Sequence, residues 1–300
     1  METEPPPPGV IVVSAPAKIN LYLHVTGRRR DGYHLLDSLV AFAGIQDRLV
    51  IGPGDDLRLL IEGRFSGAVP AGPGNIVLRA AGLLAEAAGV KARARIDLVK
   101  RLPVSAGLGG GSADAAAALR GLSTLWGVGL AEDDLLALAL DLGADVPVCL
   151  GAKAAFMGGI GGDLEAAPPL PEAWLALVNP GRPLATAAVF GNLGSAYSAP
   201  ARFAEAPPDA PALAALLETR DNGLTEAARE LEPAIGEALS ALEQSPGVLL
   251  ARMTGSGATC FGLFSQQGAA AEAASKIAAA HPRWWARPAA LAGDAGDLRV

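Results

Sequence analysis

Cysteine and aromatic side chains are scarce in this sequence of 300 residues, which has two cysteines and 5% Phe, Trp and Tyr. Neither Cys149 nor Cys260 has a second cysteine or a histidine at the spacing of a metal site, so the sequence gives no support for a zinc centre. Both cysteines lie in apolar stretches. We therefore expect two buried free thiols, which suit a reducing, cytoplasmic compartment.

Positive charge is also in short supply, with 24 Lys and Arg residues against 31 Asp and Glu residues. The net charge of −7 argues against a nucleic-acid-binding protein, which normally presents a basic face. A polyanionic substrate must then be attracted by a local cationic site rather than by the whole molecule.

Long, purely apolar runs are missing as well. The charge-free stretch 253–271 contains Gly, Ser, Thr and Gln, so it does not resemble a membrane span. Residues 1–9 lack the basic and apolar regions of a signal peptide, and their prolines predict a short extended tail. We expect no membrane association.

Patterns typical of strands and helices are mixed along the rest of the chain. With 51% hydrophobic residues, the chain can form a substantial core. The simplest architecture is α+β, with an N-terminal domain at 10–162, a C-terminal domain at 163–300 and a cleft between them. The glycines of Gly158–Gly162 mark the expected joint. The sequence leaves the oligomeric state open between a monomer and a homodimer.

Individual elements follow from periodicity, caps and turn residues. The expected strands are 10–14, 19–25, 48–51, 57–61, 94–100, 174–179, 248–251 and 259–264. The expected helices are 76–88 with Asn75 as its cap, 112–126, 132–142, 224–242 with an interruption at Pro233, and 268–280.

A glycine-rich segment, Pro103-Val-Ser-Ala-Gly-Leu-Gly-Gly-Gly-Ser-Ala113, separates the strand at 94–100 from the helix at 112–126. A strand, a glycine loop and a helix in this order direct backbone N–H groups and a helix N-terminus to one place, which predicts a phosphate site. The loop lacks the lysine of a Walker motif and the third glycine of a dinucleotide fingerprint.

The spacing Pro-x-x-x-Gly-Leu-Gly-x-x-Ser-Ala resembles the phosphate loop of the GHMP kinases, small-molecule kinases named for galactose, homoserine, mevalonate and phosphomevalonate. Three more motifs match in order: Pro16-Ala-Lys-Ile-Asn20 with Asp31-Gly-Tyr-His34, Gly143-Ala-Asp-Val-Pro147, and Met253-Thr-Gly-Ser-Gly257. The resemblance spans residues 10 to 265. It is strongest to the members that act on 4-diphosphocytidyl-2-C-methyl-D-erythritol in the non-mevalonate isoprenoid pathway.

This resemblance implies the two-domain GHMP kinase fold, with an N-terminal domain like domain 2 of ribosomal protein S5 and a ferredoxin-like C-terminal domain. It implies ATP as co-substrate with Mg²⁺, and Ser112 is a candidate Mg²⁺ contact that also caps its helix. The implied ATP-binding residues are Pro103, Val104, Ser105, Ala106, Gly107, Leu108, Gly109, Gly110, Gly111, Ser112 and Ala113.

The resemblance also implies the catalytic pair. Asp145 matches the family's catalytic base, which orients a substrate hydroxyl and accepts its proton. Lys18 matches the lysine beside that carboxylate, where its charge orients the substrate and offsets negative charge near the transferred phosphoryl group.

Five residues are implied to bind the second substrate. Asn20 lies two positions after Lys18, on the same face of a strand, and would contact the erythritol hydroxyls. Tyr33 and His34 match the pair that holds cytosine, although an aromatic pair on a loop also suits simple packing. Thr186 and Phe190 fall where the family has a threonine and a second aromatic wall.

Two alternatives remain open from the sequence. One is a GHMP kinase of the mevalonate or homoserine type, whose substrates carry no base. The other is a GHMP-fold protein that binds a ligand as a sensor without catalysis. One departure from the family is Gly223, which stands where an acidic residue is usual.

Overall fold

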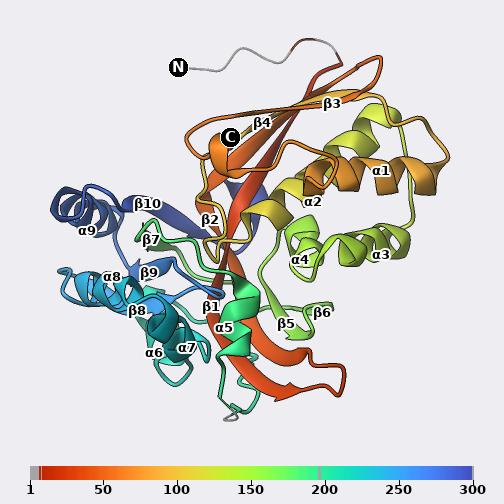
Figure 1. Ribbon diagram of the computed structural model, residues 1–300. Coiled ribbons are helices and arrows are strands. Elements are labelled where there is room, and N and C mark those ends of the chain that lie inside the picture. Colours follow the sequence, from red (N-terminus) through yellow and green to blue (C-terminus); the bar gives the residue numbers. More distant parts are fainter. Residues whose placement is uncertain (1–6, 8, 195–196, 299–300) are drawn as a thin grey trace.

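Two long antiparallel strands form the centre of the molecule (Figure 1). The computed structural model describes residues 7, 9–194 and 197–298, so most of the tail expected at 1–9 lies outside the described residues. The strands are β1 (Ile11–Arg28), β2 (His34–Gly52), β3 (Leu57–Glu62), β4 (Ala94–Val99), β5 (Ala155–Gly159), β6 (Asp163–Ala166), β7 (Ala173–Asn179), β8 (Val248–Met253), β9 (Cys260–Phe264) and β10 (Trp285–Ala292).

These strands belong to one mixed sheet, whose main path runs β3-β4-β2-β10-β7-β9-β8. Strand β1 pairs with β2 outside this path, and β5 pairs with both β2 and β6. Strands β3 and β4 are parallel, whereas the other pairs are antiparallel. Strand β2 therefore connects the two ends of the sheet.

Helices lie in two groups on opposite sides of the β1–β2 pair (Figure 1), with α2 packed against β1 and β2 and with α6, α8 and α9 packed against strands β7 to β10. The helices are α1 (Ile76–Ala88), α2 (Gly110–Trp126), α3 (Glu132–Leu142), α4 (Val146–Gly151), α5 (Thr186–Gly191), α6 (Ala210–Glu218), α7 (Thr225–Leu231), α8 (Ala234–Glu243) and α9 (Gln267–Ala280), with short 3-10 turns η1 (Ser66–Ala68) and η2 (Ala295–Asp297). Within the described chain, no helix is long and apolar enough to cross a membrane.

The expected break in the first strand is wrong. Strand β1 continues through Pro16, where its register against β2 shifts between Pro16 and Ala17. A proline lacks an N–H donor, and a strand tolerates it at such an irregularity. Strand β2 is also much longer than the expected 48–51, because residues 37–43 are buried without alternation and give no period-2 signal.

Several helix boundaries are confirmed. The Asn75 side chain accepts a hydrogen bond from the N–H of Val77 at 2.8 Å, and α1 ends at Gly89, whose φ is 66°. Helix α2 starts two residues before the expected position, so Ser112 lies in its first turn and does not cap it. Strands β5, β6 and β10 and helices α4, α5 and α6 were not expected. The Gly158–Gly162 segment lies in the β5–β6 hairpin, and the domain boundary drawn there stays a prediction.

Both cysteines are fully buried and unpaired, as expected. Cys149 lies on α4 and Cys260 begins β9. Burial raises the pKa of the Cys149 thiol to about 12 and that of Cys260 still further.

A buried carboxylate on β2 holds a long loop against the sheet. Asp37 accepts hydrogen bonds from the Tyr22 hydroxyl at 2.9 Å, from the N–H of Ala201 at 2.7 Å and from Arg202 Nε at 2.9 Å. Burial alone would raise the pKa of Asp37. The hydrogen bonds from Ala201, Arg202 and Tyr22 outweigh that effect and lower it below its ordinary value.

Replacing Asp37 by Asn should remove charged hydrogen bonds at constant shape and lower the free energy of unfolding at pH 7 by about 2 kcal/mol. A carboxyl whose pKa is lowered on folding stabilises the fold above its unfolded pKa, and this contribution disappears as the pH falls through the folded value. The difference between wild type and Asp37→Asn should therefore shrink below about pH 4 in urea unfolding experiments. A difference that is as large in acid as at pH 7 contradicts this role of the charge.

Candidate active site

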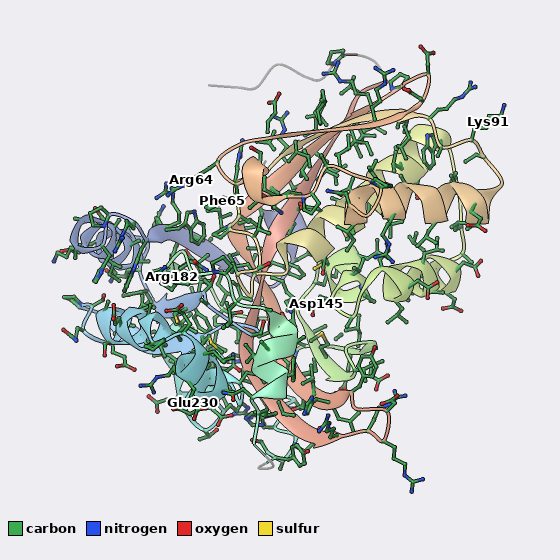
Figure 2. The ribbon with its side chains drawn as sticks, in the orientation of Figure 1. Arg64, Phe65, Lys91, Asp145, Arg182 and Glu230 are labelled. Atoms are coloured by element: carbon green, nitrogen blue, oxygen red, sulfur yellow. The ribbon has the colours of Figure 1, made fainter. Side chains whose placement is uncertain are left out.

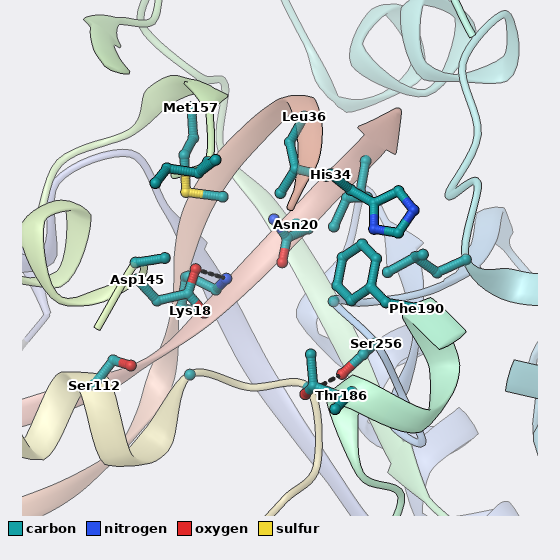
Figure 3. Close-up of a pocket in the computed structure, with 18 of the residues that line it drawn as sticks. Lys18, Asn20, His34, Leu36, Ser112, Asp145, Met157, Thr186, Phe190 and Ser256 are labelled. Carbon is teal, nitrogen blue, oxygen red and sulfur yellow. Dashed lines mark hydrogen bonds and ion pairs between the residues drawn. The ribbon is translucent and has the colours of Figure 1, made fainter. Parts of the chain in front are cut away.

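One cavity of about 870 Å³ collects the motifs found in the sequence. Its walls come from β1, the glycine loop at 103–112, the turn before β2, the start of α4, helix α5 and the turn at 254–257. Figure 3 shows how these side chains surround it. The walls thus come from segments far apart in the chain.

The glycine loop turns into α2 through two residues with left-handed backbone. Gly107 has φ of 75° and Gly109 has φ of 60°. A Cβ at Gly107 would lie 2.4 Å from the carbonyl oxygen of Thr254, and one at Gly109 would lie 3.0 Å from the Cβ of Lys18. Gly110 and Gly111 already belong to the helix. The first N–H groups of α2 have no partner within the helix, so its N-terminus offers donors and a positive dipole end to the cavity.

Most of the predicted phosphate segment faces the cavity. The lining residues are Ser105, Ala106, Gly107, Gly109, Gly110, Gly111 and Ser112. Pro103, Val104, Leu108 and Ala113 do not line it. Leu108 and Ala113 are buried in the core, where they anchor the loop.

Lys18 and Asp145 form an ion pair with 2.8 Å between Nζ and Oδ1 (Figure 3). The lysine side chain is almost fully buried, whereas that of Asp145 is 34% exposed toward the cavity. Asp145 precedes α4 and lies between the two groups of helices (Figure 2). The N–H of Lys18 donates to the carbonyl of Leu108 at 2.9 Å, so the ion pair and the glycine loop are held in register.

Asn20 lies further along β1 and is fully buried. Its N–H donates to Thr254 Oγ1 at 2.8 Å, and its Nδ2 donates to Ser38 Oγ at 2.8 Å. Its Oδ1 has no hydrogen-bond partner among the described residues. Asn20 lines the cavity, so this oxygen is a buried acceptor with unused capacity at the cavity wall.

Aromatic side chains gather at the far end from Ser112 (Figure 3). The rings of His34 and Phe190 stack with centroids 5.1 Å apart and an interplanar angle of 23°. Tyr33 is 62% exposed, so its ring does not pack against the sheet. Burial and the charge of Arg28 lower the pKa of His34. Its imidazole is thus neutral at pH 7, with one donor and one acceptor.

The second glycine turn belongs to the motif Met253–Gly257 and contributes residues that were not named individually as site residues. Ser256 Oγ lies 2.8 Å from Thr186 Oγ1 (Figure 3), and Gly255 also lines the cavity. Asn222 fixes this turn by donating to the carbonyls of Met253 and Gly255, both at 2.8 Å. The resemblance to the family already suggested a turn near the site, and the structure has Gly255 and Ser256 in the cavity wall.

Other lining residues gave no usable signal. They are apolar side chains such as Ile76, Met157 and Ile160, which look like ordinary core residues in sequence. His24, in contrast, does not line the cavity and is structural, since its Nδ1 lies 2.8 Å from the carbonyl of Ala199. Within the described residues, no group of three or more His, Cys, Asp or Glu side chains is arranged to hold a metal ion.

Family models and known proteins identify the family of this chain. The models for the GHMP kinases N terminal domain and the GHMP kinases C terminal match residues 75–153 and 204–283. The 4-diphosphocytidyl-2-C-methyl-D-erythritol kinase of Rhodospirillum rubrum is 52% identical over 95% of this chain and 93% of its own length. The protein of that name from Paramagnetospirillum magneticum is 53% identical over 93% of this chain and 98% of its own length.

Solved structures extend the comparison. A crystal structure of 4-(cytidine 5'-diphospho)-2C-methyl-D-erythritol kinase superposes with a TM-score of 0.76 at 36% identity, covering 94% of this chain and 100% of that one. A homoserine kinase from Cytophaga hutchinsonii superposes with a TM-score of 0.72 at 17% identity, covering 97% and 98%, and shares the fold. The chain therefore belongs to the GHMP kinases, ATP-dependent enzymes that act on small molecules, and within them to the family of the 4-diphosphocytidyl-2-C-methyl-D-erythritol kinases.

Proposed function

We propose that this enzyme transfers the γ-phosphoryl group of ATP to the 2-hydroxyl of 4-diphosphocytidyl-2-C-methyl-D-erythritol. The observation that carries the proposal is the order of groups along one cavity (Figure 3). The N-terminus of α2 lies at one end, the His34–Phe190 stack at the other, and the Lys18–Asp145 pair between them. A phosphate donor and a base-bearing alcohol can therefore meet at the ion pair.

The glycine loop binds the ATP phosphates in this proposal. Backbone N–H groups at the start of α2 donate to phosphate oxygens, and the helix dipole favours their negative charge. Close approach of a phosphate needs a backbone without side chains. At Gly111 a Cβ would meet only Ile76, at 4.0 Å, so the space in front of the helix is open.

Asp145 acts as the general base. Its carboxylate accepts the proton of the 2-hydroxyl while the hydroxyl oxygen forms a bond to the γ-phosphorus and the bond to the leaving ADP oxygen breaks. The Lys18 ammonium keeps the carboxylate oriented at 2.8 Å and stabilises negative charge that gathers at the transferred phosphoryl group. Asn20 Oδ1 accepts a hydrogen bond from an erythritol hydroxyl.

The aromatic end binds the cytosine. The exposed ring of Tyr33 offers a face for stacking, and Phe190 supplies the opposite wall. The neutral imidazole of His34 carries one donor and one acceptor for the edge of the base. Thr186 closes the cavity from α5 through its hydrogen bond to Ser256.

We further propose that Mg²⁺ enters with ATP. The donors present fit this ion, because Mg²⁺ in kinases takes one or two protein oxygens and completes its shell with phosphates and water. Ser112 Oγ, half-buried in the first turn of α2 at the cavity wall, would be the protein oxygen that holds it. When bound, the ion neutralises charge on the β- and γ-phosphates.

A test of the substrate is single-turnover phosphorylation with Mg-ATP and the purified protein. We expect the cytidyl substrate to be phosphorylated and mevalonate and homoserine to remain unchanged. Phosphorylation of either of these alcohols, with the cytidyl compound untouched, would favour another GHMP kinase activity. Binding of the cytidyl compound without turnover would favour a sensor.

The Asp145→Asn variant should lose about 10²-fold or more in kcat, with a smaller change in KM for ATP, because the amide cannot accept the hydroxyl proton. Steady-state kinetics on the cytidyl substrate measure both constants. Asp141→Asn is the matched control, since Asp141 is exposed on α3 and does not line the cavity. If Asp145→Asn keeps the kcat of the control, Asp145 is not the base.

Tyr33→Ala should weaken binding of the cytidyl substrate by about ten- to hundredfold, because base stacking on an aromatic ring contributes about 1–3 kcal/mol. Binding of ATP should not change. Tyr33→Phe is the control that keeps the ring, and it should bind the cytidyl substrate normally.

The uridine analogue of the substrate should be rejected, because its exchanged donor and acceptor leave buried polar groups unpaired. Equal kcat/KM for the cytidyl substrate and its uridine analogue, or an unaltered KM for the cytidyl substrate in Tyr33→Ala, would show that Tyr33 does not recognise the base.

A further inference from the structure

A fully buried carboxylate on β2 holds the residues that lead into the glycine loop. Asp47 Oδ1 accepts hydrogen bonds from the N–H of Arg101 at 2.5 Å and from the N–H of Leu102 at 2.8 Å. Two backbone donors on one oxygen fix the direction of the chain where it leaves β4. The entry to the loop is thus attached to the central sheet.

The other oxygen of the same carboxylate connects to the exit of the loop. Lys100 Nζ lies 2.5 Å from Asp47 Oδ2 and 2.5 Å from Asp114 Oδ2, and Asp114 belongs to α2. All three side chains are at most 4% exposed. Burial would lower the pKa of Lys100, but the charges of Asp114 and Asp47 and their hydrogen bonds outweigh it, so the pKa is raised and the ammonium stays charged.

This cluster lies directly beneath the start of α2. A Cβ at Gly110 would be 3.2 Å from Lys100 Nζ and 3.6 Å from Asp47 Oδ2. We propose that Asp47, Lys100 and Asp114 are positioning residues that fix both ends of the glycine loop and thereby set the phosphate-binding N–H groups in place. The inference rests on the proposed function, in which this loop binds ATP.

We call Asp47, Lys100 and Asp114 the clamp. The need for it follows from the composition of the glycine loop. Four glycines between 107 and 111 give the free chain many conformations, and ordering them on binding weakens affinity. A cluster that fixes entry and exit in advance removes part of this cost. A buried ion cluster is a poor source of net stability compared with apolar residues of the same volume. Its directional contacts suit positioning better.

The test measures the Kd of a non-hydrolysable ATP analogue by calorimetry, together with KM for the cytidyl substrate and the thermal midpoint. Asp114→Leu removes the contact to Lys100 and should weaken analogue binding by about ten- to hundredfold, because small displacements of positioned groups are costly. Asp114→Asn keeps an oxygen for the Lys100 ammonium and should recover most of the affinity. KM for the cytidyl substrate should not change in either variant.

Asp37→Asn is the matched structural control. Asp37 is also a buried carboxylate on β2 that binds a backbone N–H and a cation, but its partners, Tyr22 on β1 and Ala201 and Arg202 before α6, lie outside the glycine loop. This variant should lower the thermal midpoint and leave the analogue Kd unchanged. Asp47→Asn provides a second variant within the clamp and should weaken analogue binding.

The outcomes separate the two proposals. If folded Asp114→Leu and Asp47→Asn bind the analogue as tightly as wild type, the clamp is overturned while the proposed function stands. The clamp is also overturned if Asp37→Asn weakens analogue binding as much as Asp114→Leu, since general destabilisation then explains the effect. If the wild-type protein does not bind the analogue, the proposed function fails and the clamp fails with it.

Discussion

The active cavity depends on a backbone contact that only glycine permits. Gly107 in the phosphate loop and Gly255 in the second glycine turn lie so close that a Cβ on Gly255 would be 2.7 Å from the carbonyl oxygen of Gly107. The N–H of Thr259 also donates to the carbonyl of Ala106 at 3.2 Å. Any side chain at Gly107 or Gly255 would push the two turns apart. The two halves of the cavity would then separate.

Strand β1 holds the remaining groups at fixed spacing. The backbone N–H of Lys18 donates to the carbonyl of Leu108, and the backbone N–H of Asn20 donates to the hydroxyl of Thr254. The same two residues turn their side chains to the cavity. Groups on a paired strand are held more rigidly than groups on a loop, and transfer between two bound substrates demands such rigidity. The phosphate loop, the ion pair and the second turn are therefore aligned by one strand.

Sequence patterns predicted the parts of the site whose chemistry restricts the residue type. The glycine loop was identified from its place between a strand and a helix, whereas Lys18 and Asp145 were identified through motifs that resemble those of the GHMP kinases. The pattern missed the continuity of β1 through Pro16, because a proline suggests a break unless the partner strand is known. It missed helix α4 because its six residues are too few for a periodic signal. The apolar lining residues Met157 and Ile160 have no distinguishing sequence pattern, since only the tertiary structure shows that they line the cavity and are not ordinary core residues.

The two buried thiols can report on local unfolding of the chain around the cavity. A thiol reagent needs an exposed thiolate, and neither Cys149 nor Cys260 offers one in the folded chain. Cys149 lies on α4 beside the residues of the ion pair, and Cys260 lies on β9 just after the second glycine turn. Labelling at one site therefore requires that region to unfold at least transiently. The relative labelling rates of the two sites would compare how often each wall of the cavity opens, without any introduced cysteine.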